Sequence, residues 1–110
     1  PWVLDAVVAA GTVLEVCPWS NVSLGVYPDP DRVPLRRLLG AGAQLALGAD
    51  DPLLFGHRLT AQYEMARSVH GLTDEALAAL ATSSILGSRA PESLERLVTT
   101  EIGDWLAGRA

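Results

Sequence analysis

The stretch AQLALGADDP, residues 43–52, joins an apolar run to two adjacent carboxylates and a proline. The run is apolar apart from Gln44 and predicts a short β-strand. Asp50 and Asp51 follow side by side, although like charges repel, and Arg58 is the nearest basic residue. An Asp-Asp-Pro sequence commonly ends a strand and begins a turn. The alternative is that the two carboxylates bind a metal ion or a polar substrate.

A second strand is predicted upstream, where VLEVC at residues 13–17 stops at a proline. Between the two strands, Pro34 opens a short helical pattern that closes at Gly40 or Gly42. Strand, helix and strand in this order predict a βαβ unit with parallel strands. Because parallel strands are normally covered on both faces, we expect both to be buried. Glu15 then needs a partner that the sequence does not identify.

Most of the remaining chain is predicted to be helical. An apolar helix is expected over residues 4–10, and a long loop over residues 18–31, which are rich in turn residues. Three helices are expected after the aspartates, the second capped by Thr73 and the third starting at Pro91. The residues expected to face inward on these three helices are Leu59, Tyr63, Ala66, Leu77, Leu80, Ala81, Ser84, Leu94, Leu97, Val98, Ile102 and Trp105.

Two parallel strands alone leave both sheet edges bare, so the pattern indicates a piece of a larger α/β fold. In such folds the loops after the carboxyl ends of the strands build the active site. The two unusual segments of the chain, PWSN at residues 18–21 and DDP at residues 50–52, both lie at that end. We therefore expect functional residues among them.

The composition excludes several classes of function. The chain has 110 residues, enough for one small domain, and a net charge of −5. Its eight Lys and Arg residues are all arginines and are scattered, which argues against a nucleic-acid partner. No apolar run approaches the roughly 20 residues of a membrane span. A single cysteine allows no internal disulfide and fits a reducing, cytoplasmic location.

Other residues with chemical potential are predicted to be structural. Neither His57 nor His70 has a metal-site spacing to the two aspartates; His70 is expected to cap a helix and His57 to lie on a rim. Cys17 ends an apolar strand without a histidine nearby in sequence, so we interpret it as a small buried hydrophobic residue. Trp19 either walls a pocket or packs in the core.

Five blocks of the sequence together resemble the C-terminal part of the adenosine deaminase family. The resemblance runs from about residue 4 to residue 106, and the order and spacing of the blocks agree with it. It implies an α/β fold, the C-terminal part of a (β/α)₈ TIM barrel, in which residues 13–17 and 43–47 are strands 7 and 8. It also implies that residues 1–110 belong to a single barrel domain. The blocks are LEVCPWSN (14–21), PLRRLLGAG (34–42), LGADDPLLFG (47–56), QYEMAR (62–67) and GLTDEALAAL (71–80).

The resemblance also implies a site. Carried over by position, Asp50 is a ligand of one zinc ion and a catalytic residue, and Asp51 hydrogen-bonds a ring nitrogen of the purine. The implied reaction is zinc-dependent hydrolysis of adenosine to inosine and ammonia, with the purine nucleoside and water as partners. The alternatives within the family are deamination of adenine or of aminodeoxyfutalosine.

The chain departs from the family pattern in one important way. The family's His-x-His and His-Ala-Gly-Glu-like motifs and a further catalytic histidine are all missing, and a full barrel needs about 250 residues. The chain also begins at Pro1 rather than at a methionine. We therefore expect a C-terminal fragment that is inactive alone and completes its barrel with an N-terminal part. A non-catalytic truncated product and a metal-free α/β binding module are the other hypotheses.

Overall fold

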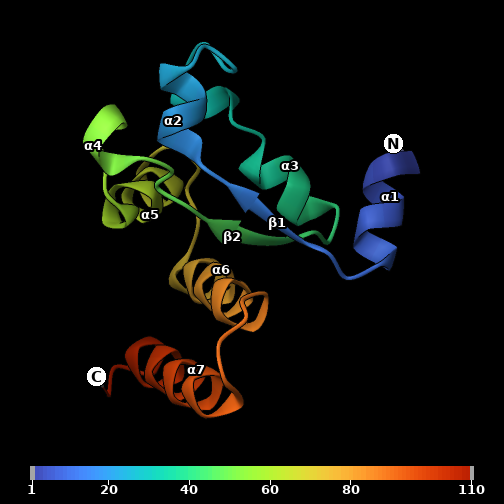
Figure 1. Cartoon of the computed structure of the whole chain (residues 1–110), viewed down its shortest axis with the longest axis vertical. Coiled ribbons are helices and arrows are strands. Elements are labelled where there is room, and N and C mark those ends of the chain that lie inside the picture. Colours follow the sequence, from blue (N-terminus) through green and yellow to red (C-terminus); the bar gives the residue numbers. More distant parts are fainter. Residues whose placement is uncertain (1, 110) are drawn as a thin grey trace.

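The computed structural model describes residues 2–109, which form two β-strands, seven α-helices and one 3₁₀-helix (Figure 1). Both strands end on the side of the molecule where α2 and α4 begin. In chain order the elements are α1 (Trp2–Ala9), β1 (Val13–Val16), α2 (Pro18–Ser23), η1 (Pro30–Arg32), α3 (Leu35–Gly40), β2 (Gln44–Leu47), α4 (Pro52–Phe55), α5 (Leu59–Ser68), α6 (Asp74–Leu86) and α7 (Glu92–Leu106).

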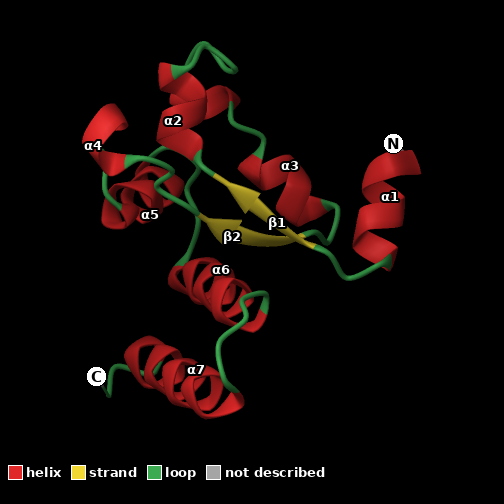
Figure 2. Ribbon diagram, viewed as in Figure 1, coloured by secondary structure: helices red, strands yellow, loops and turns green. Residues whose placement is uncertain are grey.

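The two strands form a parallel pair, as the sequence predicted (Figure 2). Val13 is in register with Gln44, and Val16 is in register with Leu47. Helix α3 lies between the strands in the chain and returns the backbone to the start of β2, so β1, α3 and β2 form a βαβ unit. The carboxyl ends of both strands consequently meet at one end of the sheet.

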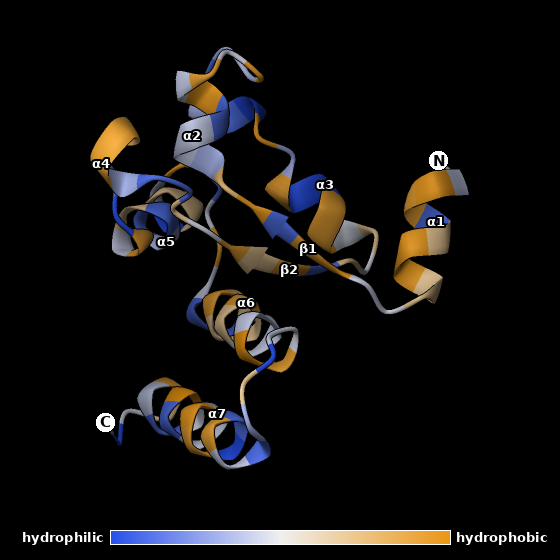
Figure 3. Ribbon diagram, viewed as in Figure 1, coloured by the Kyte–Doolittle hydropathy of each residue, from blue (hydrophilic) through white to orange (hydrophobic). Residues whose placement is uncertain are grey.

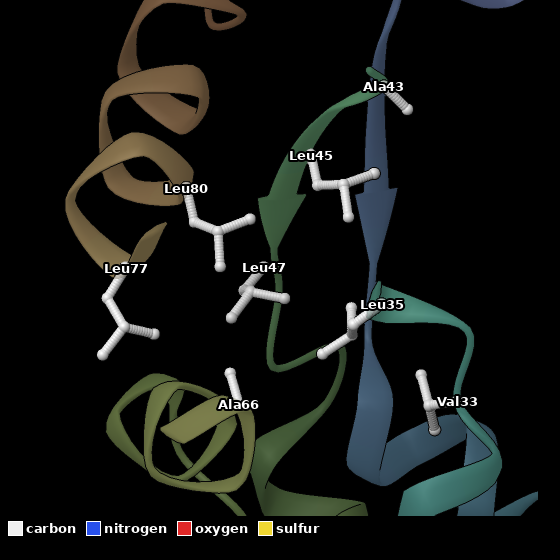
Figure 4. Packing of buried hydrophobic residues seen from close by; sticks show 8 residues of the cluster. All are labelled: Val33, Leu35, Ala43, Leu45, Leu47, Ala66, Leu77 and Leu80. Carbon is white, nitrogen blue, oxygen red and sulfur yellow. The ribbon is translucent and has the colours of Figure 1, made fainter. Parts of the chain in front are cut away.

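One face of the sheet carries the hydrophobic core. Leu45 and Leu47 of β2 point into this core, and side chains from α3, α5 and α6 cover them (Figure 4). Alternate residues of a strand point to opposite faces, which explains why these two leucines share a side. The buried cluster consists of Val33, Leu35, Ala43, Leu45, Leu47, Ala66, Leu77 and Leu80.

The opposite face of the sheet is open, so the expectation that both strands are buried on both faces is wrong for the described structure. Glu15 and Gln44 on this face are exposed, and Ala46, in register with Glu15, is only partly buried. Within residues 2–109 the hydrophobic core lies on the other face, although Val13, at the start of β1, packs against Gly87 at the end of α6. In the described structure the Glu15 side chain is exposed.

The loop that the sequence predicts over residues 18–31 instead contains α2 and η1. Pro18 occupies the first turn of α2, where its missing N–H costs no hydrogen bond. The carbonyl of Cys17 accepts a hydrogen bond from the Asn21 N–H at 3.0 Å and starts the helix. Pro30 opens η1 in the same way. The prolines of this segment thus begin short helices rather than prevent them.

The C-terminal helices follow the prediction in part. The Thr73 hydroxyl accepts a hydrogen bond from the Ala76 N–H at 3.3 Å, which confirms Thr73 as the N-cap of α6. Helix α7 packs on α6, yet Leu94, Leu97 and Trp105 remain exposed and no residue of α7 is buried. Helix α7 lies as an outer layer against α6 (Figure 2), so one neighbour covers only part of its apolar face. Among residues 2–109, no helix has the length and apolar character to span a bilayer.

Candidate functional site

The carboxyl ends of the two strands are joined by a close backbone contact. The Gly48 N–H donates to the Val16 carbonyl at 2.9 Å, which extends the parallel ladder by one residue beyond β2. A Cβ at Gly48 would lie 2.7 Å from Glu15 Oε1 and 2.9 Å from Cys17 Sγ, closer than normal contact. Only a glycine fits here without moving these side chains. The backbone two residues before Asp50 is therefore tightly packed against the end of β1.

Asp50 has an unusual backbone conformation. Its φ of 58° lies in the left-handed region, which no other non-glycine residue among residues 2–109 adopts. Aspartate tolerates this region better than most residues, but the conformation still costs about 1–2 kcal/mol. The Asp50 side chain is exposed, and no donor or cation from the described part of the chain pairs with its carboxylate. Strain at an unpaired carboxylate beyond a strand end is typical of functional sites.

Asp51 is the N-cap of α4. Its Oδ1 accepts hydrogen bonds from the Leu53 N–H at 3.0 Å and the Leu54 N–H at 3.1 Å. The interpretation of Asp-Asp-Pro as a turn therefore has a local basis, because Asp51 and Pro52 together start a one-turn helix. Both bonds go to one oxygen. No residue in the described range donates to Oδ2, which is left to accept a hydrogen bond from elsewhere.

The Cys17 thiol lies half-buried beside these residues. Burial raises its pKa above the ordinary value, and the negative charges of Glu15 and Asp50 raise it further. A hydrogen bond from the Asp50 backbone N–H opposes this shift but does not reverse it. Cys17 is therefore a neutral thiol at neutral pH, which argues against a role as nucleophile.

Two aromatic rings stack beside the site. The Trp19 and His57 rings have centroids 4.3 Å apart and planes inclined by 7°. Trp19 also donates from Nε1 to the Ala61 carbonyl at 3.2 Å and from its backbone N–H to Gln62 Oε1 at 3.1 Å. No sequence pattern signals this stack, since its two residues follow different strands. The rim position expected for His57 agrees with its partial exposure.

His70 is structural, as the sequence predicted, but its side chain bonds a distant carbonyl instead of capping a helix. Its side chain is buried, and Nε2 is 3.0 Å from the Pro30 carbonyl oxygen. A carbonyl can only accept, so this nitrogen carries the hydrogen. The bond ties the end of α5 to η1, and His70 takes no part in the site around the aspartates.

The residues at the strand ends fit a zinc ion only as part of a shared ligand set. Carboxylate oxygen is a suitable zinc ligand, and the Asp50 carboxylate is unpaired. A catalytic zinc site takes about three protein ligands. Within residues 2–109, however, no three His, Cys, Asp or Glu side chains gather as a metal site. Asp50 could therefore supply one zinc ligand, and a complete site would need further ligands from residues outside this range.

A separate hollow lies on the helical side of the molecule. It has a volume of about 600 Å³ and lies between α5, α6 and α7. Its lining is mostly apolar and includes Leu59, Tyr63, Leu77, Val98, Ile102 and Trp105. Neither Asp50 nor Asp51 borders it, so this hollow is distinct from the site at the strand ends.

Comparisons with known proteins agree on one family. The sequence model described as "Adenosine deaminase" matches residues 2–105. A putative adenosine/adenine deaminase of Streptomyces coelicolor is 61% identical over 92 residues, which are 84% of this chain and 27% of that protein. An adenine deaminase of Rhizobium leguminosarum is 45% identical over 75 residues, 68% of this chain and 23% of that protein.

Solved structures agree on the fold. The crystal structure of adenine deaminase from Arthrobacter aurescens superimposes with a TM-score of 0.92 at 30% identity, covering 96% of this chain and 32% of that chain. The Arabidopsis protein ADAL superimposes with a TM-score of 0.83 at 20% identity, covering 94% of this chain and 31% of that chain. The chain thus spans about a quarter to a third of the length of the relatives it matches.

Proposed function

Because the chain belongs to the adenosine deaminase family and forms part of a (β/α)₈ barrel, we propose that it contributes to an enzyme that removes the 6-amino group of a purine by hydrolysis. The observation that carries this proposal is the Asp50 carboxylate. It is unpaired within the described chain, held in a strained conformation and placed beyond the carboxyl end of β2. Active sites of (β/α)₈ barrels lie at that end of the strands.

In this proposal Asp50 is a ligand of a catalytic zinc ion. Zinc, when bound, lowers the pKa of a coordinated water to about 7. With zinc bound, the Asp50 carboxylate would hold the ion, and it would also accept a hydrogen bond from the attacking water and orient that water toward the purine C6. The remaining ligands and the residue that shuttles protons come from a longer parent enzyme. This agrees with the chain spanning about 27% of its Streptomyces coelicolor relative.

Asp51 is proposed to bind the purine. Its Oδ1 is held by the first turn of α4, so Oδ2 is free to meet a ring nitrogen. An ionised carboxylate only accepts hydrogen bonds, and the ring nitrogen must therefore carry a hydrogen. A hydrogen bond to a charged group is worth about 1.5–3 kcal/mol, or roughly a 10- to 150-fold difference in binding.

Adenine is a second candidate substrate, and two observations favour it. Relatives at 45% and 30% identity are named adenine deaminases. Free adenine also has a ring N–H, which can donate a hydrogen bond to an ionised Asp51. Neutral adenosine has no ring N–H, so this hydrogen bond would require an added proton either on the purine ring or on Asp51. Measured side by side on the parent enzyme, kcat/KM for adenosine and adenine decides between the two substrates.

We also propose a cytoplasmic location for the enzyme, which a single free cysteine fits.

The proposal is tested by Asp50→Asn in the parent enzyme. Asparagine keeps the size of the side chain and tolerates the left-handed conformation, so it removes the charge with little added strain. We expect loss of bound zinc, measured by metal analysis, together with loss of purine deamination. Asp31→Asn is the matched control, because Asp31 is an exposed aspartate paired only weakly with Arg32 at 3.9 Å. If Asp50→Asn keeps its zinc and its turnover, the proposed role of Asp50 is wrong.

A further inference from the structure

We propose that Trp19 and His57 are positioning residues that hold α4, and with it the carboxylate of Asp51, at the carboxyl end of the strands. We name the stacked pair the Trp19–His57 clamp. The consequence for catalysis rests on the purine-binding role proposed for Asp51. The clamp itself rests only on contacts within the described chain.

The clamp joins the two segments that follow the strands. Trp19 lies in the first turn of α2, directly after β1, and His57 lies just beyond α4, after β2. Their rings are nearly parallel, with centroids 4.3 Å apart. Stacking at this separation is a favourable aromatic arrangement. The clamp therefore fixes the distance between α2 and α4 at the end of the sheet where Asp50 and Asp51 lie.

Each ring is also held from behind. The Trp19 indole donates to the Ala61 carbonyl, and its backbone N–H donates to Gln62, which is fully buried. His57 Nδ1 is 2.8 Å from the Phe55 carbonyl oxygen. Since a carbonyl only accepts, Nδ1 carries the hydrogen, and the imidazole is tied to the last turn of α4. Neither ring can rotate away without breaking a hydrogen bond.

Within residues 2–109, helix α4 has few other contacts to hold it. It has only four residues, none of them buried, and Leu53 and Leu54 are 98% and 73% exposed. Figure 3 shows α4 as an apolar segment projecting beyond the sheet, next to α2. At its first turn α4 is held by Asp51 Oδ1, and at its last turn by the bond from His57 to the Phe55 carbonyl. Asp51 is thus attached to a helix whose orientation depends on the clamp.

Loss of the clamp should affect substrate binding more than the chemical step. Without the stack, α4 can tilt, and Asp51 Oδ2 is then less often in the position that hydrogen-bonds the purine. Loss of an aromatic pair of this kind should change the equilibrium between the held and the tilted position of α4 by about two- to tenfold. We therefore expect KM to rise by about that factor. The zinc content and kcat should stay close to those of the wild type, since Asp50 precedes α4.

The test uses Trp19→Leu and His57→Leu in the parent enzyme, with two readouts. Hydrogen exchange of the Leu53 and Leu54 amides reports on α4 independently of any activity, and steady-state kinetics report KM and kcat. We expect faster exchange and a higher KM in both variants. We also expect no further increase in the double variant, because both changes remove the same stack.

Two further variants serve as controls. Trp19→Phe keeps a ring that can stack on His57 and should restore most of the wild-type KM and amide exchange. Trp105→Leu removes an indole of α7, away from the strand ends, and should change neither readout. Either His57→Leu or Trp19→Leu suffices if the other variant does not fold.

The outcomes separate this inference from the proposed function. If the Leu53 and Leu54 amides exchange at the wild-type rate in both variants, the clamp does not hold α4. If exchange accelerates while KM stays the same, positioning of Asp51 by the clamp is wrong. If exchange accelerates in a parent protein that deaminates no purine, the clamp is supported and the proposed function fails.

Discussion

Gly48→Ala should destabilise the protein, although its backbone conformation is one that alanine can adopt. The new Cβ would lie 2.7 Å from Glu15 Oε1 and 2.9 Å from Cys17 Sγ. In the described structure the Glu15 carboxylate is the end of a flexible, exposed side chain and can move away at little cost. The Cys17 sulfur has a single rotatable bond and sits at the end of β1, so relief requires a rotamer change or a shift of the strand.

The size of the effect follows from two opposing contributions. Overpacking of this kind costs about 1–3 kcal/mol. Replacing glycine by alanine also restricts the unfolded chain, which returns about 0.4–1 kcal/mol. We therefore expect the free energy of unfolding to fall by about 0.5–2 kcal/mol in urea denaturation of the complete protein. Gly103→Ala in α7 is the control. A Cβ at Gly103 would have nothing within 4 Å of it, so that substitution should stabilise the helix by about 0.5–1 kcal/mol.

A double variant identifies the atom responsible. If Cys17 Sγ is the obstacle, Gly48→Ala combined with Cys17→Ala should be more stable than the sum of the single effects, by about 1 kcal/mol. Adding Glu15→Gln instead should restore nothing, because glutamine has the same shape as glutamate. Strictly additive effects of Gly48→Ala and Cys17→Ala would refute the argument that the thiol and the glycine are in contact.

Three other predictions concern the core, a helix cap and the thiol. Leu45→Ala should lower the free energy of unfolding by about 2–5 kcal/mol in the same denaturation experiment, because Leu45 is almost fully buried in the core. Thr73→Ala should cost about 1 kcal/mol through loss of the α6 cap. The hydrogen bond from Thr73 lowers the pKa of Glu75 in the folded protein. The ionised Glu75 therefore stabilises the fold at pH values above the ordinary glutamate pKa of about 4.3. This stabilisation is lost as the pH falls through the lowered pKa of the folded state. Thr73→Ala should raise that pKa in an NMR titration. Cys17 should react with iodoacetamide more slowly than a free cysteine at pH 8, and Glu15→Gln should speed the reaction because it removes one charge that raises the thiol pKa.

The strands and their parallel pairing could be predicted because short apolar runs on either side of a helix have few other solutions. The open face could not be predicted. An apolar pattern shows which residues can be buried, and Glu15 is exposed only because no layer covers it in the described structure. Helix α2 was missed because Pro18 and Asn21 are common in loops, and the same proline is also well suited to the first turn of a helix.

At the candidate site, the sequence pointed to Asp50 and Asp51 through their charge and position. Two features needed the structure. The positive φ of Asp50 depends on a backbone path that the local sequence does not specify. The stack of Trp19 on His57 joins residues that follow different strands, and no periodicity links positions so far apart.

The register of β1 and β2 also has a kinetic consequence. Val13 pairs with Gln44, so the pairing closes a loop of about thirty residues, and closure of such a loop costs on the order of 3 kcal/mol of chain entropy. Helices α6 and α7 follow each other in the chain and can dock without such a closure. We therefore expect the helical hairpin to form early, and the strand ends that carry Asp50 and Asp51 to assemble late, near the end of the folding reaction.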